Sequence, residues 1–172
     1  LCASTLSGQK ALSNIESPPS YNPQELIKEI RTIVEEACKR DSNSYGYNIW
    51  THHVVDVVKH SKELAIKLNA DIEVVEIAAL LHDYAGIIDI KFEKDHHIHG
   101  ARMAEELLSA RDYPRTKIDM VKQCILSHRA SHLMEKHYPE EKCVASADAM
   151  AHINQIPEML HYVYTVRKME VD

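Results

Sequence analysis

The chain has 172 residues, of which 45% are hydrophobic and 27% charged, a composition typical of one soluble globular domain. Its net charge of −6 at pH 7 gives no indication of a nucleic-acid-binding surface. The four cysteines are scattered without a Cys-x-x-Cys pair, which argues against a zinc finger or a disulfide framework. No apolar run approaches the roughly 18 residues of a transmembrane helix, and no signal sequence is visible, so we expect a cytoplasmic protein.

The low content of turn-forming residues, 4 Gly and 6 Pro, favours helices over a many-stranded sheet. Residues 1–22 are rich in Ser, Pro and Asn, so we predict a flexible N-terminal extension followed by one domain over residues 23–172. That domain is predicted to be all-α, with about seven helices and no significant sheet. Its first helix follows a capping Asn22, has Pro23 at its first position and ends near Arg40.

The second predicted helix covers residues 51–68, with Thr51 as its cap and His53 at the head of an apolar stripe. Taken alone, a histidine in that position is more often a satisfied core residue than a metal ligand. Asn69 is expected to close this helix in the left-handed conformation.

The third predicted helix, residues 72–84, is apolar until it reaches His82 and Asp83. Because such a helix must be buried, its end carries an imidazole and a carboxylate into the interior, where an unpartnered charge is costly. A metal ion would satisfy both groups, although a buried ion pair or a helix cap would explain the dipeptide alone. We expect the helix to break at residues 85–86 and residues 87–95 to be irregular.

Three histidines in four residues, at positions 96, 97 and 99, open the fourth predicted helix. His99 is best aligned with the apolar stripe that follows, so it is favoured over His97 as a buried functional residue. A solvated histidine cluster is the alternative. The neighbouring Gly100 is small, as close helix packing or a crowded site would require.

The fifth predicted helix starts at Pro114 and carries His128 at its inner end, as the second helix carries His53. Residues 129–139 are polar and could form a lid or a dimer contact. In the sixth helix, which begins at Pro139, a face of small residues is interrupted by a carboxylate that needs a partner. That residue is Asp148, and a structural ion pair is its alternative role. A seventh helix is expected over residues 157–168.

The ordered pattern His…His-Asp…His…His…Asp across these helices resembles the HD-domain superfamily of metal-dependent phosphohydrolases. The segments that carry the resemblance are HHVVDVVKHSKELA, AALLHDYAG, HHIHGARMAEELL and ASADAM. The match extends from about Pro23 to Arg167. The His-Asp dipeptide alone is a weak signal, whereas the ordered set with these flanking residues is specific.

The resemblance implies an HD-type bundle with two divalent ions, which the sequence does not distinguish among Fe, Mn, Mg, Co and Zn. The metal ligands it implies are His53, His82, Asp83, His99, His128 and Asp148. Asp83 would bridge the ions, and together with His82 it would form the catalytic pair at which an activated water attacks phosphorus. The candidates for holding the rest of a phosphate are Arg102, Arg129 and Lys94.

We therefore expect a phosphohydrolase that cleaves an ester or anhydride of a small phosphorylated substrate, such as a nucleotide or phosphodiester. Cyclic-di-GMP is not favoured, since HDYAG is not followed by the Gly-Tyr-Pro signature of HD-GYP domains and Arg129 occupies the place of their additional histidine. Two alternatives remain: a di-iron oxygenase of the HD fold, and a non-catalytic module that senses a ligand. No membrane or nucleic-acid partner is expected, and a homodimer could form through residues 129–139 or the last helix.

Overall fold

The computed structural model describes residues 21–129, 134–156, 160, 162–166 and 168–169. Within these residues the fold is all-α, with helices α1 to α7 and no strand, so the predicted fold class is confirmed. The last described element is the π turn η3 (Tyr162–Val166). Most of the predicted N-terminal extension, part of the loop 129–139 and much of the predicted seventh helix lie outside the described residues, and the domain boundaries stay a prediction.

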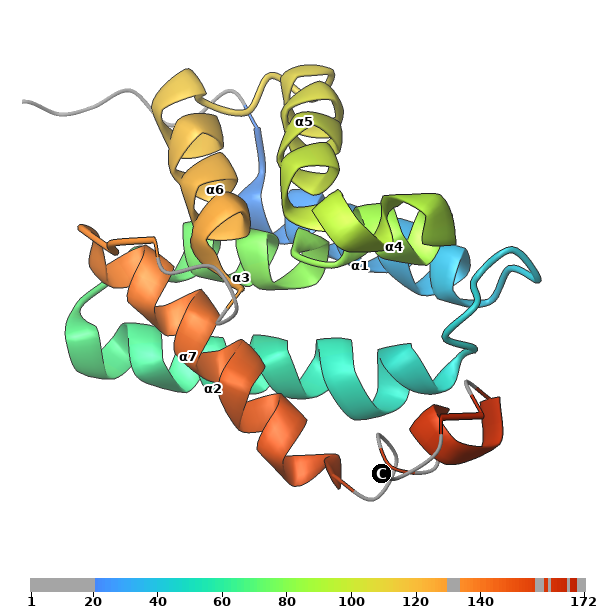
Figure 1. Ribbon diagram of the computed structural model, residues 1–172. Coiled ribbons are helices and arrows are strands. Elements are labelled where there is room, and N and C mark those ends of the chain that lie inside the picture. Colours follow the sequence, from blue (N-terminus) through green and yellow to red (C-terminus); the bar gives the residue numbers. More distant parts are fainter. Residues whose placement is uncertain (1–20, 130–133, 157–159, 161, 167, 170–172) are drawn as a thin grey trace, which may run out of the picture.

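Two helix pairs lie on either side of a central helix (Figure 1). In one pair, α2 (Val55–Leu68) packs along α7 (Pro139–Asn154), and in the other, α5 (His96–Ser109) packs along α6 (Arg115–Ser127). The central helix, α3 (Ile72–Leu81), contacts α2, α6 and α7. It therefore ends among the helices whose histidines and carboxylates the sequence singled out.

Burial on all sides explains why α3 is apolar from Val74 to Leu81 except at Glu76, a buried carboxylate that pairs with Arg31 and Lys62. All residues from Val74 to Leu81 are buried, and α1 (Pro23–Cys38) covers a further side of the helix. Its N-terminus is fixed by Asp71, whose side chain accepts hydrogen bonds from the backbone N–H groups of Glu73 and Val74. Because α3 is both buried and capped, the residues at its C-terminal end have a rigid support.

The helix ends were predicted with mixed success. The Asn22 side chain caps α1, and Asn69 closes α2 with φ 53° and ψ 41°, as expected. Thr51 does not cap α2, because it lies inside a π turn, η1 (Trp50–Val54), and its hydroxyl donates to Asn48 O. This wide turn precedes α2 directly and carries His53 on its inner side, where the histidine is buried.

The helix predicted over residues 72–84 is divided in the structure. α3 ends at Leu81, and α4 (Tyr84–Ile88) begins after a turn in which Asp83 has φ −104° and ψ 4°. The predicted break at residues 85–86 is therefore wrong, since both residues are helical in α4. The His-Asp pair itself forms the turn: His82 keeps helical backbone angles at the end of α3, and the backbone departs from them at Asp83.

Two glycines allow neighbouring segments to approach closely. A Cβ atom on Gly86 would lie 3.2 Å from Tyr45 Oη, so the absence of a side chain here serves packing rather than a helix break. A Cβ atom on Gly100 would lie 3.4 Å from Ile125 Cγ2 and 3.6 Å from His82 O. The first turn of α5 can thus lie against both α6 and the end of α3.

Candidate metal centre

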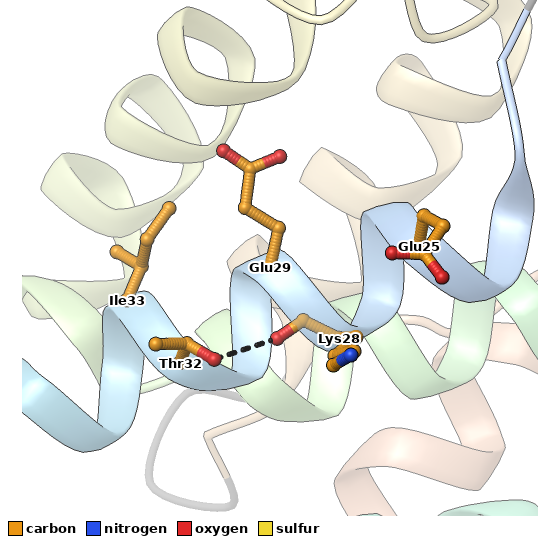
Figure 2. Close-up of a pocket in the computed structure, with 5 residues that line it drawn as sticks. All are labelled: Glu25, Lys28, Glu29, Thr32 and Ile33. Atoms are coloured by element: carbon orange, nitrogen blue, oxygen red, sulfur yellow. Dashed lines mark hydrogen bonds between the residues drawn. The ribbon is translucent and has the colours of Figure 1, made fainter.

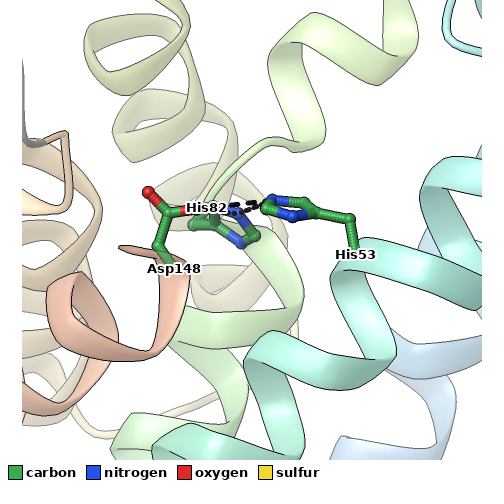
Figure 3. A group of neighbouring side chains, drawn as sticks. All are labelled: His53, His82 and Asp148. Atoms are coloured by element: carbon green, nitrogen blue, oxygen red, sulfur yellow. Dashed lines mark hydrogen bonds and ion pairs between the residues drawn. The ribbon is translucent and has the colours of Figure 1, made fainter. Parts of the chain in front are cut away.

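A first group of metal-binding side chains comes from three elements far apart in the sequence (Figure 3). His53 lies in η1, His82 directly follows α3, and Asp148 lies in α7, and all three are buried. His53 Nε2 is 3.1 Å from His82 Nε2 and 3.4 Å from Asp148 Oδ1, and His82 Nε2 is 3.8 Å from the same carboxylate oxygen. Three potential ligand atoms therefore face one small volume.

A second group lies beside the first and consists of Asp83, His96 and His128. His96 is the first residue of α5, directly after the 3-10 helix η2 (Ile90–Asp95), and His128 follows the last residue of α6. The Nε2 atoms of these two histidines are 3.0 Å apart. Asp83 Oδ1 lies 3.1 Å from His96 Nε2 and 3.7 Å from His128 Nε2.

Asp83 connects the two groups. Its Oδ1 atom faces His96 and His128, whereas its Oδ2 atom lies 3.2 Å from His53 Nε2 and 3.1 Å from His82 Nε2. One carboxylate thus presents one oxygen to each group, which is the arrangement of a bridging ligand between two ions. The turn between α3 and α4 is what allows this side chain to reach both sides.

The two groups contain four histidines, and three of them are fixed by a hydrogen bond from Nδ1, the ring nitrogen that faces away from the neighbouring ligand atoms. The acceptor is each time the carbonyl oxygen three residues earlier: Ala79 O is 2.8 Å from His82 Nδ1, Glu93 O is 2.7 Å from His96 Nδ1, and Ile125 O is 2.6 Å from His128 Nδ1. Since a carbonyl oxygen only accepts, each Nδ1 carries a proton and each neutral ring presents the Nε2 lone pair inward.

These tautomers imply that a cation belongs at the centre. Two Nε2 lone pairs 3.0 Å apart, as in His96 and His128, repel each other unless a proton or a metal ion lies between them. Metal–nitrogen bonds of about 2.1 Å, set at about 90° to 110°, put ligand atoms roughly 3.0 to 3.4 Å apart. Imidazole and carboxylate ligands suit Zn, Fe, Mn or Co, so the residues present fit two divalent ions.

The pKa values show how strongly the site favours positive charge. Burial by itself lowers the pKa of His82, but the carboxylates of Asp83 and Asp148 more than compensate and raise it to about 9. The pKa of His96 is likewise raised, because Asp83 outweighs the effect of burial. For Asp83, burial raises the pKa, yet the neighbouring imidazoles, His82 first and then His128 and His53, hold it well below its ordinary value.

Of the six predicted ligands, His99 is the one that belongs to neither group. Its ring packs on Phe92 with the ring centroids 4.4 Å apart, and His96 occupies the corresponding place in the second group. The buried face of α5 runs through His97, Gly100, Ala101, Ala104 and Leu108, so His99 lies off the stripe with which the prediction aligned it. A usable signal was Gly100, which lies four residues after His96 on the same helix face and permits the close approach.

The three predicted phosphate-binding residues lie outside both groups. Arg102 is 66% exposed at its side chain, and its Nε atom is 3.6 Å from Glu106 Oε1. Arg129, next to His128, donates from its guanidinium to Lys94 O at 2.5 Å, which ties the end of α6 to η2. The side chain of Lys94 is exposed. Their roles in substrate binding remain predictions.

His152, which the sequence did not single out, lies one turn after Asp148 on α7. Its Nε2 atom is 3.2 Å from Asp148 Oδ1, and its ring stacks on that of His53 with centroids 4.7 Å apart and planes at 27°. The sequence could have indicated His152 through its four-residue spacing from Asp148, because that spacing places both side chains on one helix face.

A shallow hollow on the outer face of α1 is unrelated to these groups (Figure 2). All of its lining residues come from that one helix: Glu25, Lys28, Glu29, Thr32 and Ile33. The Thr32 hydroxyl donates to Lys28 O within the helix at 3.0 Å. The hollow contains no residue of either metal-binding group and does not compete with them as the functional site.

The model of the HD domain family matches residues 50–152, a span from η1 to α7 that includes both groups. The chain belongs to the HD domain family. Its fold is similar to that of a predicted HD superfamily hydrolase from an uncultured Thermotogales bacterium, with a TM-score of 0.64 and 27% identity over 83% of this chain and 82% of that chain. The Lin1889 protein of Listeria innocua shares the fold, with a TM-score of 0.63 and 21% identity over 88% of this chain and 70% of that chain.

Curated relatives include ribonuclease Y proteins from two bacteria. The protein of Rubrobacter xylanophilus is 32% identical over 109 residues, which are 63% of this chain and 19% of that protein. The protein of Mycoplasma capricolum is 30% identical over 132 residues, which are 73% of this chain and 24% of that protein. The chain thus spans about a fifth to a quarter of the length of these relatives. In the part of the chain that the structure describes, no helix is long and apolar enough to cross a membrane.

Proposed function

We propose that the protein is a metal-dependent phosphohydrolase that cleaves a phosphate ester or anhydride in a small phosphorylated substrate. The observation that carries this proposal is the pair of His/Asp groups with Asp83 between them, one carboxylate oxygen toward each. Membership of the HD domain family and the similarity to a predicted HD superfamily hydrolase support a metal-dependent phosphohydrolase in general.

In this proposal the side chains of the two groups bind the ions, and backbone carbonyls keep the histidine rings in position. His53, His82 and Asp148 would hold one ion, and Asp83, His96 and His128 would hold the second with Asp83 shared. The backbone carbonyls behind three of the rings keep their Nε2 atoms directed inward before any ion binds. When bound, two such ions lower the pKa of a water molecule and stabilise negative charge on phosphoryl oxygens.

The net charge and the relatives both support a substrate class for this proposal. A net charge of −6 disfavours a long polyanion, so a small anion drawn to the metal centre is the better fit. The relatives are named ribonucleases, which act on RNA, and this supports a phosphodiester or nucleotide as the substrate class. Arg129 is the predicted phosphate contact closest in sequence to a ligand, directly after His128.

The direct test is release of phosphate or nucleotide from a panel of nucleotides, cyclic nucleotides, sugar phosphates and short oligoribonucleotides. Each reaction is run with Mn²⁺, Mg²⁺, Co²⁺ or Fe²⁺. We expect turnover with at least one metal, and a loss of about 100-fold or more in Asp83→Asn, which keeps the size of the side chain but weakens the shared ligand. Asp89→Asn is the matched control, because Asp89 lies outside both groups and pairs with Lys91.

The outcomes separate the proposal from its alternatives. Equal activity in wild type and Asp83→Asn, or no turnover with any metal, would contradict it. Bound iron together with oxygen consumption would favour the di-iron oxygenase. Metal that is retained without turnover, in a chain stabilised by a phosphorylated ligand, would favour the sensing module.

A further inference from the structure

His53 differs from the other three histidines of the centre. The others each donate an Nδ1 hydrogen bond to a backbone carbonyl, whereas His53 Nδ1 is buried and has no hydrogen-bond partner among the described residues. A ring that lacks this bond needs another contact to hold its orientation, because metal-ligating imidazoles depend on such outer support. Within the described residues, the ring that stacks on it is His152.

The same histidine also lies beside a second ligand of the first group, whose Oδ1 atom is buried without a hydrogen bond within the described residues. Asp148 is buried, and its Oδ1 atom lies 3.2 Å from His152 Nε2, nearer than the 3.4 Å to His53 Nε2 and the 3.8 Å to His82 Nε2. The side chain of His152 is 49% exposed, so it lies at the solvent side of the group rather than within it. One residue thus touches two of the three side chains.

We infer that His152 is a positioning residue of the first metal-binding group: its ring orients His53 by stacking, and its Nε2 atom orients the carboxylate of Asp148. The inference rests on the proposed metal centre. It predicts a larger effect on one ion than on the other, because His96 and His128 are each fixed by a backbone hydrogen bond of their own.

The test is a titration of the metal-free protein with Co²⁺, followed by calorimetry and by the visible spectrum of the bound ion. Wild type is expected to bind two equivalents. In His152→Ala, one equivalent should bind about 10- to 100-fold more weakly, with an altered spectrum, while the other keeps its affinity. Ile153→Ala is the matched control, because Ile153 is the next residue of α7 and is 67% exposed.

Two further variants separate the contacts. His152→Phe retains a ring for stacking, and His152→Gln retains a polar group for Asp148, so partial recovery of the weakened equivalent in either one supports positioning. Unchanged binding of both equivalents in His152→Ala would overturn the inference while leaving the metal centre intact. Equal weakening of both, with a lowered melting temperature, would assign a general structural role and also overturn it. A wild-type chain that binds no Co²⁺ would contradict the metal centre itself.

Discussion

In three of the four histidines of the proposed centre, the two ring nitrogens have different roles. Nδ1 of His82, His96 and His128 is committed to a backbone carbonyl, so that Nε2 is left as an inward-facing lone pair. This arrangement is fixed by the fold before any ion arrives, which lowers the cost of ordering the ligands on binding. It also identifies ligands by a criterion other than helical periodicity.

That criterion makes His96 and His99 a matched pair for mutation. His96→Ala should remove one ligand of the second group and weaken one bound ion by at least about 10-fold, because the remaining residues are Asp83 and His128 alone. His99→Ala should leave both ions in place, since the His99 ring packs on Phe92. Metal content measured after dialysis distinguishes the two variants, and loss of an ion from His99→Ala would contradict the assignment of His96.

Metal binding should release protons. Neighbouring carboxylates raise the pKa of His82 from its ordinary 6.5 to about 9, so the metal-free site retains a proton near neutral pH, and an ion must displace it. Apparent metal affinity should therefore rise as pH increases toward about 9 and level off above that value. Calorimetric titration in buffers of different ionisation enthalpy measures the released protons, and pH-independent affinity would contradict this view of the site.

At the scale of secondary-structure elements, the centre forms where helices end. The turn between α3 and α4, the start of α5 and the end of α6 supply His82, Asp83, His96 and His128. Side chains at helix ends can converge from several directions without breaking the hydrogen-bonded interior of a helix. At Gly100, α5 lies against both Ile125 of α6 and the carbonyl of His82 at the end of α3.

Gly100 therefore gives a test at this scale. Gly100→Ala adds a Cβ atom at ordinary contact distance, 3.4 Å from Ile125 Cγ2, and should be neutral or stabilise the helix by up to about 1 kcal/mol. Gly100→Leu should destabilise the fold by about 1 to 3 kcal/mol, because its side chain must push α5 away from α6 and the end of α3. Urea unfolding measures both, and equal stability of the two variants would contradict the proposed packing.

Local sequence signals predicted the positions of most helices, but they failed at two helix ends and at one residue of the centre. Caps and apolar stripes located most helices, because Asn22 and Asn69 act through contacts with residues adjacent in sequence. The π turn at Thr51 and the break at Asp83 could not be read from the sequence, because the packing of distant segments imposes them. His96 was missed for the same reason: its place depends on the position of α3, which its own helix does not encode.

For the molecule as a whole, the proposed centre joins elements from nearly the full length of the described chain. Its residues come from η1, the turn after α3, α5, the end of α6 and α7. Bringing them together requires the folded state, so ions that bind here bind the unfolded chain far less well. Metal and fold should therefore stabilise each other.

Removing metal should consequently lower thermal stability. Free metal at 100 times its dissociation constant stabilises a folded protein by about 2.7 kcal/mol per site, so chelation should reduce the melting temperature by several degrees. Adding Mn²⁺ should restore it in wild type, and much less in Asp83→Ala, which lacks the shared carboxylate. Calorimetric scans with and without chelator measure the difference. A metal-independent melting temperature in wild type would contradict the coupling.

The most direct test of the binuclear centre is anomalous scattering from a crystal of the protein equilibrated with Mn²⁺ and measured at the manganese absorption edge. Two peaks are predicted, one among His53, His82 and Asp148 and one between His96 and His128, with Asp83 reaching both. A single peak would contradict the assignment of two ions. No peak at either group, or a peak beside His99 instead of His96, would contradict the proposed set of metal ligands.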